Sequence, residues 1–151
     1  MNRKKEKLKI ILVDDMLDEH IIFQKMLQSL EFLELELVSC HSAGELEKLM
    51  DEHPHLSPHM IFLDMHMPGK NGIHCLKSIR SNEEFKETVV AMYSVAADED
   101  TVGKCLGAGA NIFITKPRDL NILKNTLQEV LKSCMQYHSM DLNFETFVRT
   151  F

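Results

Sequence analysis

The protein has 151 residues, of which 44% are hydrophobic and 7% are aromatic, and its formal net charge is -6. A chain of this length can bury the core of one domain, whereas two domains would be cramped. The acidic balance argues against nucleic-acid binding through a broad basic face.

The cysteines and the N-terminus bear on the cellular compartment. The cysteines are spread singly, with neither a C-x-x-C pair nor the spacing of metal ligands, so they indicate small buried side chains in a reducing compartment. The basic N-terminus leads into an apolar run at 8–13 that is only a strand's length and ends at Asp14-Asp15. Neither a signal peptide nor a membrane span is supported. We therefore expect a cytoplasmic protein.

Apolar runs typical of strands alternate along the chain with the three-and-four spacing typical of helices. The expected strands cover residues 8–13, 33–38, 60–63, 88–93 and 111–115. The expected helices cover residues 16–30, 42–52, 72–80, 98–106 and 118–134. Residues 81–87 are expected to form a polar loop.

Local signals support this order of elements. Residues 33–38 alternate strictly between apolar and polar side chains, which favours a half-exposed strand at a sheet edge. Ser42 and Glu45 have the spacing of a capping box, which predicts the start of the second helix. Five strands, each followed by a helix, predict an α/β fold with a doubly wound parallel sheet in the order 2-1-3-4-5.

Acidic residues stand where two of these strands end. Asp64 follows the apolar run 59–63 and precedes the loop sequence Met-His-Met-Pro-Gly-Lys-Asn-Gly, and Asp14-Asp15 close the run 8–13. The carboxyl ends of parallel strands form the edge where open α/β sheets bind their ligands. Three carboxylates this close stay ionised together only if a cation offsets their charge, so they predict a divalent-cation pocket.

Two further strand ends carry polar residues, with Ser94 after the fourth strand and Lys116-Pro117 after the fifth. Together with Asp14-Asp15, Asp64 and the Met-Pro-Gly-x-x-Gly loop, they closely resemble the receiver domain of bacterial two-component response regulators. The resemblance covers about residues 8–134 and implies a flavodoxin-like (βα)5 fold. It also implies a phosphorelay signalling protein of the single-domain type, without an output domain.

Asp64 is the candidate phosphoacceptor, because a carboxylate can take a phosphoryl group and form a reactive acyl phosphate. The carboxylate and the phosphoryl group are both anionic, so Mg2+ would be needed to offset their charge. The resemblance implies that Asp15 binds the Mg2+ ion directly and that Asp14 binds it mainly through water. It further implies that Asp64 and the backbone carbonyl group of His66 complete the protein's ligands.

The resemblance also assigns roles to residues near the ends of the last two strands. Lys116 would contact the phosphoryl oxygens as a point charge, and the hydroxyl group of Ser94 would donate to them. Phe113 occupies the family's aromatic switch position, which turns inward when the Ser/Thr side chain moves. Many receivers carry Tyr there, so Phe keeps the packing change but loses the partner contact of the hydroxyl group. Val95 is a second departure, because a branched side chain there is expected to narrow access to the pocket.

Other functions fit parts of the pattern. A receiver-shaped scaffold that never turns over phosphate would be consistent with Val95, although the complete acidic set and Lys116 argue against it. A small-molecule phosphohydrolase of the dehalogenase-like type would need Asp-x-Asp, and Asp64-Met65-His66 lacks the second acid. A zinc site is not favoured, because the candidate histidines span different elements and do not converge. These histidines are His53, His55, His59, His66 and His74.

The resemblance implies an output through protein contact, and no enzyme activity beyond the protein's own phosphoryl transfer and dephosphorylation. The phosphoryl donor would be a sensor histidine kinase or a histidine phosphotransfer protein, and the signal would pass to a downstream protein. The face formed by the fourth helix, fifth strand and fifth helix is a candidate for homodimer contacts. No nucleic-acid or membrane partner is expected.

Residues 1–134 are expected to form the receiver domain, and residues 135–151 a C-terminal tail. The tail carries large apolar side chains, which include Phe144, Phe147 and Phe151. We expect the tail to pack on the domain or on a partner, where each fully buried phenylalanine contributes about 1.5 to 3 kcal/mol. A frayed tail is the alternative, because chain termini are often disordered.

Overall fold

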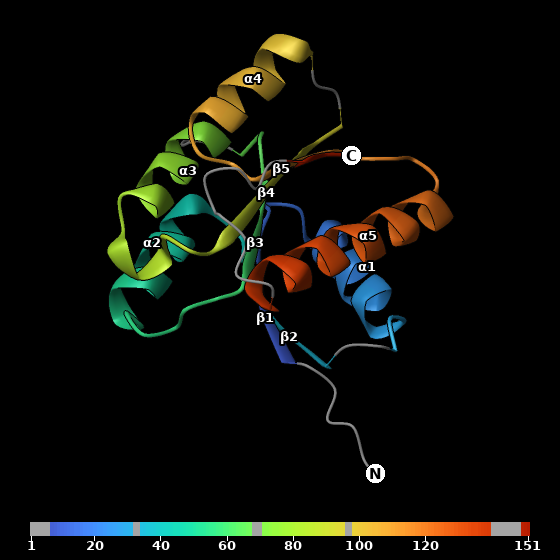
Figure 1. Cartoon of the computed structure of the whole chain (residues 1–151), viewed down its shortest axis with the longest axis horizontal. Helices are drawn as coiled ribbons and strands as arrows, with labels where there is room; N and C mark the ends of the chain where they lie inside the picture. Colours follow the sequence, from blue (N-terminus) through green and yellow to red (C-terminus); the bar gives the residue numbers. More distant parts are fainter. Residues whose placement is uncertain (1–6, 32–33, 68–70, 96–97, 140–148) are drawn as a thin grey trace.

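The computed structural model describes residues 7–31, 34–67, 71–95, 98–139 and 149–151, in which six parallel strands form one sheet with helices on both faces (Figure 1). The strand order is β2-β1-β3-β4-β5-β6. The predicted order 2-1-3-4-5 is therefore confirmed, and a short sixth strand is added beside β5.

The secondary structure follows the predicted alternation of strands and helices. The strands are β1 (Lys7–Val13), β2 (Glu34–Cys40), β3 (Met60–Asp64), β4 (Val89–Ser94), β5 (Ile112–Thr115) and β6 (Arg149–Thr150). The helices are α1 (Leu17–Gln28), α2 (Ala43–Glu52), α3 (Gly72–Arg80), α4 (Glu99–Gly107) and α5 (Leu120–Ser139), with a 3-10 turn η1 (Glu83–Phe85). Residues 135–139, expected to begin the tail, instead continue α5 because Tyr137 is buried against the core.

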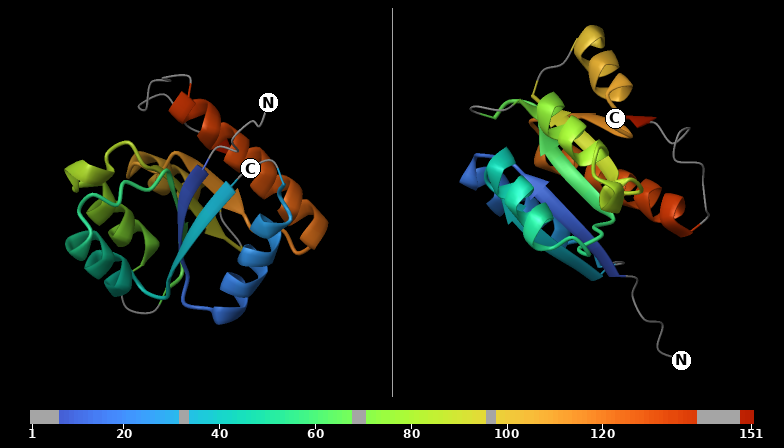
Figure 2. Two further views of the ribbon diagram at one scale, coloured as in Figure 1. Left: turned by 90° about the horizontal axis from the view of Figure 1, so that it is seen from below. Right: turned by 90° about the vertical axis from the view of Figure 1, so that its left-hand side faces the viewer.

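Side chains alternate between the two faces of each inner strand, and this alternation decides which helices they meet. On β4, Val89, Ala91 and Tyr93 pack in the cluster formed with α1 and α5. Val90 and Met92 pack in the opposite cluster, formed with α2, α3 and α4. Figure 1 and the left view of Figure 2 show these two helix layers on opposite sides of the sheet. The inner strands are therefore covered on both faces, as their apolar runs predict.

Local sequence signals account for several element boundaries. The Ser42 side chain accepts a hydrogen bond from the Glu45 backbone N–H at 3.1 Å, which confirms the predicted cap of α2. Strand β2 lies at the sheet edge, where exposed and half-buried residues alternate along most of its length, also as predicted. The stretch 81–87 is not wholly a loop, because Phe85 is fully buried and the turn η1 forms around it.

Strand β6 extends the sheet beyond β5. The Phe151 N–H donates to the Phe113 carbonyl oxygen at 2.9 Å, and the Thr115 N–H donates to the Phe151 carbonyl oxygen at 3.1 Å. These bonds occupy part of the β5 edge, whose backbone groups would otherwise be open to another chain. Residues 140–148, which carry most of the apolar side chains of the tail, lie outside the described residues, so their packing stays a prediction.

Removing residues 149–151 should destabilise the domain, because the two backbone hydrogen bonds to β5 are lost. Each such bond contributes about 0.5 to 1.5 kcal/mol, so the melting temperature should fall by roughly 2 to 10 °C. Circular dichroism during heating measures this fall. Phe151→Ala is the matched control, because it keeps both backbone bonds and should lower the melting temperature less. Equal melting of the full-length and shortened chains would contradict the pairing.

Candidate functional site

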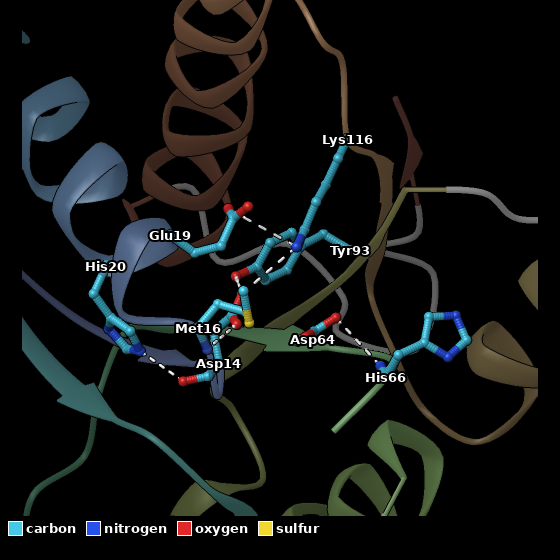
Figure 3. A network of polar contacts seen from close by, with 8 residues as sticks. All are labelled: Asp14, Met16, Glu19, His20, Asp64, His66, Tyr93 and Lys116. Atoms are coloured by element: carbon cyan, nitrogen blue, oxygen red, sulfur yellow. Dashed lines mark hydrogen bonds and ion pairs between the residues drawn. The ribbon is translucent and has the colours of Figure 1, made fainter. Parts of the chain in front are cut away.

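Three carboxylates meet at the carboxyl edge of the sheet, and Figure 3 shows Asp14 and Asp64 among them. Asp14 and Asp15 follow β1, Asp64 ends β3, and the ligand atoms of these side chains lie within 4.8 Å of one another. Asp14 is fully buried and Asp64 is 6% exposed, whereas Asp15 is exposed. In the part of the chain that the structure describes, no other cluster of three or more His, Cys, Asp or Glu side chains could hold a metal ion.

A close backbone approach fixes the position of Asp64. Gly72 begins α3 and donates its N–H to the Met65 carbonyl oxygen at 3.1 Å. A Cβ atom at Gly72 would lie 2.7 Å from the Asp64 carbonyl oxygen, which is closer than side-chain carbons pack. Glycine is therefore required at the last position of the Met-Pro-Gly-x-x-Gly pattern. The proline of that pattern, Pro68, and its first glycine, Gly69, lie outside the described residues.

Protein donors surround the Asp14 carboxylate (Figure 3). Its Oδ1 atom accepts a hydrogen bond from the Met16 N–H at 2.9 Å, and its Oδ2 atom accepts one from the Tyr93 hydroxyl group at 2.5 Å. The Lys116 Nζ atom lies 3.5 Å from the same Oδ2 atom. The Asp14 main chain is also held, because its carbonyl oxygen lies 2.7 Å from the His20 Nε2 atom. Burial, followed by the charge of Asp14, raises the pKa of Tyr93 well above its usual range, so Tyr93 keeps its proton.

Asp64 is slightly more accessible than Asp14. Its Oδ1 atom accepts a hydrogen bond from the His66 N–H at 3.2 Å. Burial raises the pKa of the Asp64 carboxyl group, and the charges of Asp14 and Asp15 act in the same direction. The His66 N–H and the Lys116 ammonium group oppose this rise without cancelling it. Asp64 without a metal therefore binds a proton more readily than an exposed aspartate does, and a nearby cation would favour its charged form.

Lys116 and Ser94 lie at adjacent strand ends. The Lys116 N–H donates to the Ser94 carbonyl oxygen at 2.7 Å, which joins the ends of β5 and β4. The Lys116 ammonium group pairs with Asp14 and lies 3.9 Å from the Glu19 Oε2 atom. Ser94 is buried at the same edge of the sheet. Both residues predicted for the site thus lie at the carboxyl edge of the sheet, and the Lys116 side chain is turned toward Asp14.

The residues that depart from the receiver pattern differ in their burial. Phe113 is 1% exposed and packs in the cluster with α2, α3 and α4. Val95 is 64% exposed and lines a cavity that also borders Lys116. The movement of Phe113 between two positions stays a prediction.

Tyr93 is a site residue that the apolar run 88–93 does not reveal, because a tyrosine in a buried strand counts as core. In the sheet, Tyr93 lies opposite Asp64 in the register of β3 and β4. It faces the side covered by α1 and α5. Counting by twos along each strand places Asp14, Asp64 and Lys116 on that same face. The alternation of side chains was therefore the signal that could have found it.

Comparison with known proteins agrees with this site. Residues 10–128 match the response regulator receiver domain family. Chemotaxis protein CheY1 of Helicobacter pylori is 30% identical over 124 residues, which cover 82% of this chain and 97% of that protein. The structure of the phosphorylated cyanobacterial phytochrome response regulator RcpA is 25% identical, with a TM-score of 0.75 over 85% of this chain and 94% of that one. A chain of the CheX-CheY-BeF3-Mg2+ complex from Borrelia burgdorferi is 26% identical, with a TM-score of 0.65 over 82% and 89%.

The chain therefore belongs to the response regulator receiver domain family. Its function is that of a phosphorylation-controlled switch in two-component signalling, and the acidic cluster fits that function. The resemblance and the flavodoxin-like fold predicted from the sequence are both confirmed. Within the described residues, none of the helices combines the length and apolar character that crossing a membrane requires.

In the absence of divalent cations, Asp64→Asn should stabilise the protein at neutral pH. A carboxyl group with a raised pKa binds its proton more tightly in the folded state, so the folded state loses stability as the pH rises. Asparagine carries no charge and avoids this loss. The gain should appear as the pH rises above about 4, the ordinary pKa of an aspartate, and level off above the raised pKa of Asp64. Melting temperatures measured in EDTA across this pH range test the expectation.

Asp98→Asn is a control with the opposite sign. Asp98 caps α4, and its hydrogen bond from the Thr101 N–H lowers its pKa, so its charge favours the folded state as the pH rises. Removing this charge should not raise the melting temperature at neutral pH. A melting temperature of Asp64→Asn equal to or below that of wild type at neutral pH would contradict the raised pKa of Asp64.

Proposed function

We propose that Asp64 accepts a phosphoryl group from a sensor histidine kinase or a histidine phosphotransfer protein. The observation that carries the proposal is the meeting of Asp14, Asp15 and Asp64 within 4.8 Å, with Lys116 paired to Asp14 at the rim. Asp64 ends the inner strand β3, and the close approach of Gly72 fixes its main chain. The similar RcpA structure is of a phosphorylated protein, which supports the same chemistry here.

The transfer exchanges one bond to phosphorus for another. A carboxylate oxygen of Asp64 bonds to phosphorus as the phosphorus–nitrogen bond of the donor's phosphohistidine breaks, and the imidazole leaves with a proton from solvent. The product is an acyl phosphate on Asp64. Lys116 would leave Asp14 and contact the phosphoryl oxygens, and Ser94 would donate its hydroxyl group to them. Hydrolysis by water later restores the carboxylate and releases inorganic phosphate.

The donor atoms of the cluster fit Mg2+, because hard cations prefer carboxylate and carbonyl oxygens. We propose that Asp15 and Asp64 bind the ion directly, together with the backbone carbonyl group of His66, and that Asp14 binds it mainly through water. Bound Mg2+ supplies positive charge that offsets the charge of the carboxylate and the phosphoryl group. The similar CheX-CheY complex contains Mg2+ and BeF3, which supports Mg2+ as the bound cation.

The proposed output is protein contact, with no enzyme activity beyond the protein's own phosphoryl transfer and dephosphorylation. Ser94 and Phe113 would couple phosphorylation to the surface formed by α4, β5 and α5, where a downstream protein or a second copy would bind. Strand β6 lies along the β5 edge of this surface, so a partner there must either contact β6 or displace it. We expect these contacts to take place in the cytoplasm.

Asp64→Asn should abolish phosphorylation, because an amide cannot act as an anionic nucleophile. After incubation with acetyl phosphate and Mg2+, intact mass should show one added phosphate on wild type and none on this variant. Asp98→Asn changes an exposed aspartate at the start of α4 and should behave as wild type. An equal mass gain on Asp64→Asn and wild type would show that another residue is the acceptor.

Asp15→Asn should weaken Mg2+ binding, because a hard cation loses a charged oxygen ligand. The loss should be on the order of tenfold or more, measured by isothermal titration calorimetry. Lys116→Gln should change the affinity less, since Lys116 is not among the proposed ligands. Unchanged affinity in Asp15→Asn would mean that the ion is not held by this cluster.

A further inference from the structure

Tyr93 lies within the acidic site without being one of the residues that the proposed function assigns to it. It is opposite Asp64 in the register of β3 and β4, on the face that α1 and α5 cover. Its side chain is 4% exposed and crosses the end of β3 to reach Asp14, which follows β1 (Figure 3). A buried tyrosine usually finds a partner for its hydroxyl group. Here that partner belongs to the functional site.

The Tyr93 hydroxyl group completes a set of protein donors around Asp14. The Asp14 Oδ2 atom accepts from this hydroxyl group and lies 3.5 Å from Lys116 Nζ. The Oδ1 atom accepts from the Met16 N–H. Asp14 is fully buried and both of its carboxylate oxygens already have a protein partner, so a cation, or a water bound to it, would have to share or displace one of these contacts.

The Tyr93 ring also holds the lysine of the site. The Lys116 Nζ atom lies 4.1 Å from the ring centroid, within the range of a cation–π interaction. The same ring lines an apolar cavity of about 210 Å³ between α1 and α5, together with Phe23 and Leu127. The Tyr93 ring therefore lines this cavity while its hydroxyl group reaches the acidic cluster, and the Lys116 Nζ atom lies over the ring beside Asp14.

We propose that Tyr93 is a positioning residue that holds Asp14 and Lys116 together while the protein is metal-free and unphosphorylated. The inference rests on the proposed function, because it concerns how the Mg2+ and phosphoryl sites are kept ready. While the Tyr93 hydroxyl group donates to Asp14, this hydrogen bond partly offsets the negative charge of the carboxylate. Mg2+ therefore competes with Tyr93 for Asp14. Lys116 stays on Asp14 and the ring until phosphoryl oxygens on Asp64 attract it.

Tyr93→Phe tests the competition, because it removes the hydroxyl group and keeps the ring. Asp14 then loses a donor, and Mg2+ affinity measured by calorimetry should rise on the order of fivefold. Tyr137→Phe is the matched control, since it removes the hydroxyl group of the chain's second tyrosine, which is buried in α5. It should bind Mg2+ as wild type does. Melting temperatures show whether each variant is folded.

A coupled substitution separates positioning from a general change in packing. If the hydroxyl group acts through Asp14, Tyr93→Phe should change Mg2+ affinity by less than about twofold when Asp14 is already asparagine. A change in packing would act on the site in either background. Persistence of the full effect in the Asp14→Asn background would therefore overturn the proposal.

The remaining outcomes distinguish this inference from the proposed function. A folded Tyr93→Phe protein with Mg2+ affinity equal to or weaker than wild type would overturn the role of Tyr93. Wild type would still bind Mg2+ and take phosphate on Asp64, as the proposed function requires. Absence of Mg2+ binding in both proteins would overturn the proposed metal site and the inference with it.

Discussion

The crowding of negative charge at the carboxyl edge of the sheet is the constraint on which this site depends. Like charges this close raise one another's pKa unless donors or cations offset them. The innermost acid, Asp14, is offset by protein donors on both oxygens, Asp64 by a backbone N–H, and Asp15 by solvent. In the proposed metal site, a cation would therefore meet the exposed Asp15 first, and would reach Asp14 only by competing with contacts that already exist.

The parallel sheet produces this crowding through the same alternation that builds its core. Leu12, Phe62 and Ile114 pack against α1 and α5, and the residue two positions further along each strand is a charged residue of the site. The apolar packing of that layer therefore sets the spacing of the charges. The site is held by the ends of strands rather than by loops alone, so its geometry is coupled to the stability of the core.

The acidic cluster could be predicted because it depends on a local pattern, an apolar run of strand length followed by an acid. The strand order could be predicted from the alternation of strands with helices and from the edge pattern of residues 33–38. The role of Tyr93 could not be read in this way, because its partner Asp14 is 79 residues away in the sequence and two strands away in the sheet. The partner of Lys116 also escapes prediction, since a long flexible side chain can reach several carboxylates. Strand β6 could not be predicted for another reason, because two residues are too few to show an alternation of apolar and polar side chains.

The direction of β6 has a practical consequence for how this protein can be extended. The strand runs parallel to β5, and the Phe151 carbonyl oxygen accepts a hydrogen bond from Thr115, the residue directly before Lys116. A chain fused after Phe151 would therefore emerge at the carboxyl edge of the sheet, level with the Thr115 end of β5. A fluorophore attached there would lie close to the end of β5 that carries Lys116. A bulky affinity tag there would crowd this edge of the sheet. The tag belongs at the N-terminus instead, because β1 begins at Lys7 on the opposite edge.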